Sequence, residues 1–223
     1  MFARLLAALC IVLSFGLSTG RAEPVSSPDR RVVVYLQTGA SRESDRTVSY
    51  MQRELETLMQ TAGYSVEWKV LGDSPSVTEG SIALVELRGS CRAPETNAYV
   101  KPVKNGASLA STAVEGGRVL PFSWINCETL TQMLAPVLAG RKSGQRDFLY
   151  GRAMGRVLAH ELYHLLANTR EHAGSGVGKS SFSARELLSE HFTFEDSTLA
   201  GFNAPDSGTF DEPAGAEEPD AGR

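Results

Sequence analysis

The chain has 223 residues, 42% of them hydrophobic, and a formal net charge of −4. This length and apolar content suffice for one domain with a proper core. An acidic chain without a basic cluster is a poor candidate for binding nucleic acid or anionic membrane surfaces, so neither is expected as a partner.

The first 22 residues have the layout of a secretory signal peptide. Arg4 precedes an apolar run, Leu5–Ser18, which is followed by Gly20–Ala22 and then by Glu23. This pattern predicts cleavage after Ala22. The run is short for a bilayer span, so a stable membrane anchor is not expected, and we predict a secreted or periplasmic protein. After cleavage the net charge falls to −6, because two arginines leave with the peptide.

Apolar periodicity predicts the elements of the first half of the chain, after a polar leader at residues 23–30. A β-branched run predicts a strand buried on both faces, helical spacing predicts one helix, and alternation predicts a half-buried strand. In chain order the elements are a strand at Arg31–Leu36, a helix at Val48–Ala62 ended by Gly63, a strand at Tyr64–Val70 and a strand at Ile82–Leu87.

Two further strands are predicted at Ala107–Val114 and Arg118–Ile125, joined by a hairpin turn signal at residues 115–117. A helix follows at Glu128–Leu138, with Asn126 as its candidate cap. The two cysteines that remain after cleavage are Cys91 and Cys127. An even pair in an oxidising compartment favours a disulfide over two free thiols.

One long amphipathic helix is predicted from about Arg146 to Asn168, because its apolar residues recur at three- and four-residue steps. Gly151 and Gly155 weaken this helix and would be poor choices unless another element packs closely there. Stop and turn signals follow at Asn168-Thr169 and at Ala173–Gly176.

The long helix carries the string H-E-L-Y-H at residues 160–164, and a further histidine, His172, follows it. Positions i and i+4 of a helix lie on one face, so His160 and His164 can present two imidazoles to one zinc ion. Glu161 sits at the edge of that face, where it can hold and deprotonate the attacking water instead of binding the metal. This is the division of labour in H-E-x-x-H metallopeptidases. The plain alternative is a helix with two surface or core histidines, followed by an unrelated third one.

The third zinc ligand is predicted to be His172. A chain that turns back on the glycines of Ala173–Gly176 can bring it under the metal, and imidazole is a common zinc ligand. A short helix at Ser183–His191 offers the alternative, in which Glu186 or Glu190 reaches back as a carboxylate ligand. Residues 173–180 fit a relaxed phosphate-loop pattern, but they follow a polar helix end instead of a buried strand, so no nucleotide is expected.

The order of these elements, with H-E-x-x-H on a late helix, resembles the N-terminal subdomain of the zincin metallopeptidases from about Arg31 to Phe194. The resemblance implies an α+β fold with a twisted mixed β-sheet over an active-site helix, a backing helix behind it and a small C-terminal subdomain. It also implies that one strand between Ala107 and Ile125 is a sheet edge that pairs with extended substrate.

Within this clan the chain is similar to the metzincins, which use three histidines, and it departs from them in three ways. Their third histidine would fall at Arg170, their helix-ending glycine would fall at Ala167, and no methionine follows Met154 to form their methionine turn. The segment His160–Ser183 looks like small exported bacterial proteins that carry a metzincin-like variant of the motif, with the third histidine twelve residues after the first.

These observations predict a zincin-like catalytic domain over residues 31–202 and a disordered acidic tail at 203–223. The predicted function is that of a secreted zinc metallopeptidase acting on a peptide or protein substrate. Zn²⁺ would be held by His160, His164 and His172, and Glu161 would be the general base. The alternative is a non-catalytic zinc-binding protein of the same fold that serves as a peptide- or protein-binding module. The sequence predicts neither cleavage specificity nor an oligomeric state.

Overall fold

The computed structural model describes residues 30–38, 45–70, 80–95 and 107–203. The predicted signal peptide at 1–22, the leader before residue 30 and the tail after residue 203 lie outside the described residues. Within the described ranges, no helix combines the length and the apolar character that crossing a membrane would require.

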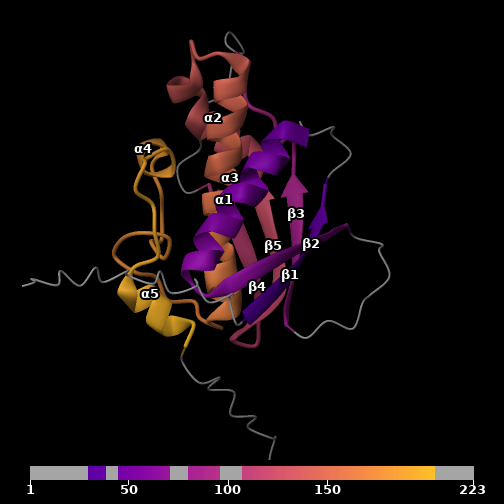
Figure 1. Cartoon of the computed structure of the whole chain (residues 1–223), viewed down its shortest axis with the longest axis vertical. Helices are drawn as coiled ribbons and strands as arrows, with labels where there is room; N and C mark the ends of the chain where they lie inside the picture. The colour runs from indigo at the N-terminus through magenta and orange to yellow at the C-terminus, as the bar shows by residue number, and fades with distance from the viewer. Residues whose placement is uncertain (1–29, 39–44, 71–79, 96–106, 204–223) are drawn as a thin grey trace, which may run out of the picture.

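Five strands form one mixed sheet (Figure 1). Their order is β2-β1-β3-β5-β4, in which the first four strands are parallel and β4 runs antiparallel to β5 at one edge. The strands are β1 (Arg30–Gln37), β2 (Tyr64–Val70), β3 (Ser81–Arg88), β4 (Ala110–Glu115) and β5 (Arg118–Asn126). The prediction of an α+β fold with a mixed sheet is confirmed, and the predicted strands all lie within two or three residues of the observed ones.

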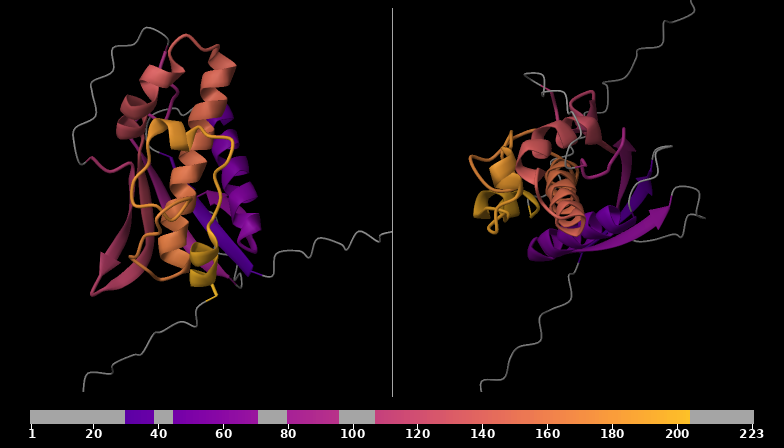
Figure 2. Two further views of the ribbon diagram at one scale, coloured as in Figure 1. Left: turned by 90° about the vertical axis from the view of Figure 1, so that its left-hand side faces the viewer. Right: turned by 90° about the horizontal axis from the view of Figure 1, so that it is seen from above.

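Three longer helices and two short ones lie in the part of the chain that the structure describes. They are α1 (Asp45–Thr61), α2 (Cys127–Leu138), α3 (Ser143–Leu166), α4 (Ala184–Leu187) and α5 (Asp196–Gly201). The helices α1 and α3 pack side by side on one face of the sheet, and the segment with α4 and α5 runs along α3 (Figure 2). The core between sheet and helices includes Val34, Leu55, Val85, Ile125 and Leu158, all buried.

Two of the three glycines of α3, Gly151 and Gly155, mark its closest contact with α1. A Cβ atom at Gly155 would lie 2.6 Å from the carbonyl oxygen of Met51, and one at Gly151 would meet the carbonyl oxygen of Thr47. The expectation that another element packs closely at these positions is confirmed. The helix that carries the motif is therefore held against its neighbour at backbone distance.

A buried arginine joins α1, α3 and the segment after α4. Arg156 is only 1% exposed, and its Nε donates to the carboxylate of Glu54 at 2.6 Å. Its Nη1 donates to the carbonyl oxygens of Leu187 at 3.0 Å and Ser189 at 2.8 Å. The helix predicted at Ser183–His191 is a single turn, Ala184–Leu187, and the carbonyls of Leu187 and Ser189 accept from Arg156 instead of continuing it.

The predicted disulfide joins Cys91, after β3, to Cys127, the first residue of α2. Asn126 caps α2 as predicted, since its side chain accepts from the backbone N–H of Thr129. The hydroxyl of Tyr150 in α3 donates to the carbonyl of Cys127 at 3.0 Å. The start of α2 is thus tied both to the sheet and to α3.

Candidate metal centre

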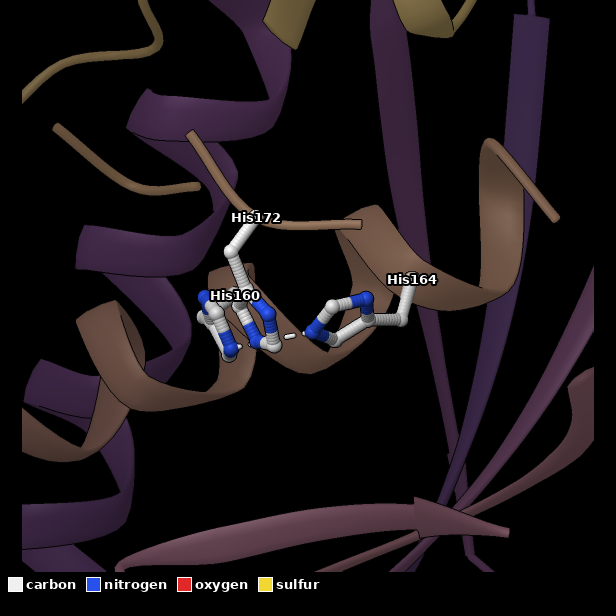
Figure 3. Close-up of side chains that lie close together, drawn as sticks. All are labelled: His160, His164 and His172. Carbon is white, nitrogen blue, oxygen red and sulfur yellow. Dashed lines mark hydrogen bonds between the residues drawn. The ribbon is translucent and has the colours of Figure 1, made fainter. Parts of the chain in front are cut away.

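Two imidazoles meet on the face of α3 that points away from its glycine contact with α1. His160 and His164 are one turn apart and both buried, and their Nε2 atoms lie 3.0 Å from each other. His172, exposed on the loop after the helix, brings its ring within 4.8 Å of the His164 ring centre and 5.3 Å of the His160 ring centre (Figure 3). One nitrogen from each of the three rings lies within 4.8 Å of the others.

Backbone carbonyls fix which nitrogen carries the proton in the two buried rings. Nδ1 of His160 is 2.7 Å from the carbonyl oxygen of Val177, and Nδ1 of His164 is 2.9 Å from that of Thr169. A carbonyl oxygen can only accept, so each Nδ1 must donate. In a neutral imidazole the lone pair then lies on Nε2.

The short distance between the two Nε2 atoms is therefore a convergence of lone pairs, because a hydrogen bond between them would require one ring to be charged. Burial and the neighbouring histidines disfavour that charge: they lower the pKa of His160 to about 4, against the opposing effect of the Val177 carbonyl. Burial also lowers the pKa of His164. Two neutral, desolvated nitrogens facing each other repel unless a cation lies between them.

The donor set fits a divalent transition metal. Nitrogens at about 2.0–2.1 Å from a tetrahedral zinc ion lie about 3.3–3.4 Å apart, close to the observed separation of the two Nε2 atoms. Neutral imidazole is the form that binds a metal. A carbonyl behind each ring is also the arrangement that orients histidine ligands and strengthens them. The residues present thus supply both the ligand nitrogens and the hydrogen-bond partners that orient them.

The loop that carries His172 is built on the predicted turn. Asn168 adopts a left-handed conformation (φ 44°) that ends α3 and aims the Thr169 carbonyl at His164. Further on, the N–H of Ala173 donates to the carbonyl of Gly178 at 2.7 Å. Val177 is fully buried, and its N–H donates to the carbonyl of Thr193 at 2.9 Å. One loop therefore supplies both the third imidazole and the carbonyl that orients the first.

Glu161 lies beside the histidine cluster without belonging to it. Its side chain is 5% exposed, and its Oε2 accepts a hydrogen bond from the Thr112 hydroxyl at 2.6 Å. Burial raises the pKa of Glu161 to about 7, although the Thr112 hydrogen bond opposes the rise. The sequence does not single out Thr112. Its only signal there is its place on one of the two strands of which one was expected to form the sheet edge.

A pocket of about 510 Å³ opens over His160, Glu161 and His164. One side is β4, the antiparallel edge strand, and other walls come from Arg170, Phe182 and their neighbours in the loop after α3. The expectation that a strand between Ala107 and Ile125 forms a sheet edge beside the site is confirmed by the position of β4.

The carboxylates considered as alternative ligands are not part of the cluster. The carboxylate of Glu186 accepts from the ammonium of Lys179 at 2.5 Å and from the N–H and hydroxyl of Ser183, which lower its pKa to about 2. Glu190 is exposed. Among the residues that the structure describes, the group of side chains close enough to share a metal contains the three histidines and no carboxylate.

No protein-family model matches the chain, and no curated protein matches it either. The geometry of the described residues is therefore what carries a functional assignment.

Proposed function

We propose that the chain is a zinc metallopeptidase of zincin type, with His160, His164 and His172 holding the ion. The observation that carries the proposal is the pair of buried Nε2 lone pairs converging at 3.0 Å. Each ring donates its Nδ1 proton to a backbone carbonyl, so a proton between the two Nε2 atoms would require a charged ring. Zinc is favoured over other metals because three imidazoles on a helix and its following loop form the common donor set of catalytic zinc sites.

Zinc bound there supplies Lewis-acid activation of a water molecule and of the peptide carbonyl. Glu161, which lines the same pocket, takes a proton from the water as its oxygen bonds to the carbonyl carbon. The same carboxyl then delivers that proton to the nitrogen of the leaving amine as the C–N bond breaks. Burial, which raises the pKa of the Glu161 carboxyl, makes the carboxylate a stronger base for the first half of this transfer.

An extended peptide is the substrate that the pocket favours. The strand β4 is the last strand of the sheet on that side and lines the pocket. An exposed strand edge offers backbone donors and acceptors to a peptide of any sequence. We therefore place the substrate along β4, with its scissile carbonyl over His160 and Glu161.

Export to an oxidising compartment is part of the proposal. It is supported by the disulfide between Cys91 and Cys127 and by the signal-peptide pattern at residues 1–22. The protein recovered outside the cytoplasm should begin at Glu23. Its intact mass should correspond to that chain less the two hydrogens lost when the disulfide forms. Recovery of the uncleaved chain with both thiols free would contradict export.

Digestion of a proteome-derived peptide library tests the catalytic proposal directly. The purified protein should cleave peptides, a chelator should abolish cleavage, and added Zn²⁺ should restore it. If the protein binds one zinc per chain and cleaves no peptide in the library, it is a zinc-binding peptide- or protein-binding module instead.

A further inference from the structure

The carboxyl of Glu161 is held by a residue of the neighbouring sheet edge. Thr112 lies on β4, where the pairing register with β5 shifts between Thr112 and Val114. Its hydroxyl is 2.6 Å from Oε2 of Glu161 and 2.9 Å from the hydroxyl of Ser123, its partner on β5. Ser123 is 3% exposed, so this chain of hydroxyls runs from the buried sheet to the pocket.

The direction of the two hydrogen bonds follows from counting protons. When the carboxylate of Glu161 is ionised it can only accept, so Thr112 then donates its single hydroxyl proton to it. Thr112 can then only accept from Ser123. The carbonyl oxygen of Glu161 is also within reach of Thr112, at 3.3 Å, but the shorter bond to the charged group is the stronger of the two.

The second carboxyl oxygen remains available for chemistry. Glu161 lines the pocket, and no hydrogen bond from the described residues reaches its Oε1. Fixing Oε2 therefore restricts the rotation of the carboxyl group and leaves Oε1 for the attacking water.

We infer that Thr112 is a positioning residue for the general base, with Ser123 orienting its hydroxyl. The kinetic part of this inference rests on the proposed peptidase function, whereas the contact between hydroxyl and carboxyl does not. A base displaced by about 1 Å from its productive position costs on the order of a hundredfold in rate, and loss of one of its restraints should cost somewhat less.

Four variants test the inference. Thr112→Val keeps the shape and the β-branching of the side chain but lacks the donor, whereas Thr112→Ser keeps the donor. Ser123→Ala removes only the group that orients the Thr112 hydroxyl. It also covers the case in which Thr112→Val does not fold. Thr47→Val is the matched control, because the Thr47 hydroxyl is also buried but has no hydrogen-bond partner.

Kinetics on the zinc-loaded protein should separate an effect on the position of Glu161 from an effect on substrate or zinc binding. We expect Thr112→Val to lower kcat about 10- to 100-fold, with KM and zinc content unchanged. Ser123→Ala should lower kcat less, and Thr112→Ser and Thr47→Val should stay near wild type. If the wild type is active and Thr112→Val retains its full kcat, the positioning role is wrong while the peptidase proposal stands.

Infrared spectroscopy of the metal-free protein tests the contact without any turnover. The difference between wild type and Glu161→Gln identifies the carboxyl band of Glu161. We expect that band to shift in Thr112→Val and to stay in place in Thr112→Ser and Thr47→Val. An unshifted band in Thr112→Val overturns the contact itself. If the wild type cleaves no peptide, the proposed function fails and the kinetic role fails with it, whatever the infrared bands show.

Discussion

The two halves of the candidate metal centre differ in how firmly they are held. His160 and His164 are buried on α3, which contacts α1 at backbone distance through Gly155. His172 is exposed on a loop that is held mainly by backbone hydrogen bonds around Ala173 and Val177. Packing fixes side chains more firmly than a single turn does, so the helix half is organised in advance and the loop half depends more on the metal.

The two halves are nevertheless joined by hydrogen bonds, since the Thr169 carbonyl, after the helix, accepts from His164. The carbonyl oxygen of Val177, in the loop, accepts the hydrogen bond from His160, on the helix. The loop therefore contributes to the helix half even where it does not touch the metal. Substitutions on α3, in the loop and at the contact with α1 should separate the contribution of the helix half from that of the loop half.

The largest expected effect lies on the helix, at the general base. Glu161→Gln keeps the size of the side chain but cannot take a proton, so peptide hydrolysis should fall about 10²- to 10⁴-fold. Zinc content should remain one per chain, because the cluster of possible ligands does not include Glu161. Steady-state kinetics with metal analysis measures both. Loss of zinc together with activity would make Glu161 a ligand.

The next effect lies in the loop. His172→Ala should weaken zinc binding by more than about 100-fold, since even loss of a residue that only supports a ligand typically costs about 10- to 100-fold. Glu186→Ala and Glu190→Ala are the controls and should bind zinc as the wild type does. Competition titrations with a zinc-binding dye give the three affinities. A large loss in either glutamate variant, with His172→Ala unaffected, would reverse the assignment of the third ligand.

The sequence predicted the helix half of the site more completely than its surroundings. The spacing of His160, Glu161 and His164 defines one helical face whatever surrounds it, and His172 lies close to the two histidines, as the glycine turn predicted. Thr112 escaped prediction because it meets Glu161 only through the pairing of β4 with β5 and the packing of the sheet on α3. Arg156 escaped for the same reason, since its partners lie on α1, at the end of α4 and just after it.

The contact of α3 with α1 offers a third test, on stability. Gly155→Ala improves helix propensity by about 1 kcal/mol, but its new methyl group would meet the backbone of Met51, which cannot move aside easily. We expect the free energy of unfolding to fall by about 1–3 kcal/mol. Gly144→Ala, in the first turn of the same helix with nothing within 4 Å, should be neutral or stabilising by up to about 1 kcal/mol. Urea denaturation compares the two, and equal effects would refute the close contact.

The smallest effect concerns the pH dependence of the metal-free protein, in which His160 and Glu161 act in opposite directions. His160 has a pKa of about 4 when folded and 6.5 as its ordinary value, so the unfolded chain takes up a proton first as the pH falls. Its contribution to stability is therefore lost as the pH falls from about 6.5 to about 4. Glu161 has a pKa of about 7 when folded against an ordinary value of 4.5, so its contribution is present at low pH and lost as the pH rises from about 4.5 to about 7.

Between these limits the two contributions largely cancel, and removing one should expose the other. Glu161→Gln abolishes the contribution of Glu161 to stability, which grows on acidification. The Tm of this variant should therefore fall more between pH 7 and pH 5 than the Tm of the wild type does. Each Tm is compared with the value of the same protein at pH 7. Glu190→Gln, which changes an exposed carboxylate outside the cluster, should follow the wild type. Thermal unfolding with a chelator present measures all three. Parallel curves for Glu161→Gln and the wild type would mean that, in the metal-free protein, Glu161 is not held in a site that favours its protonated form.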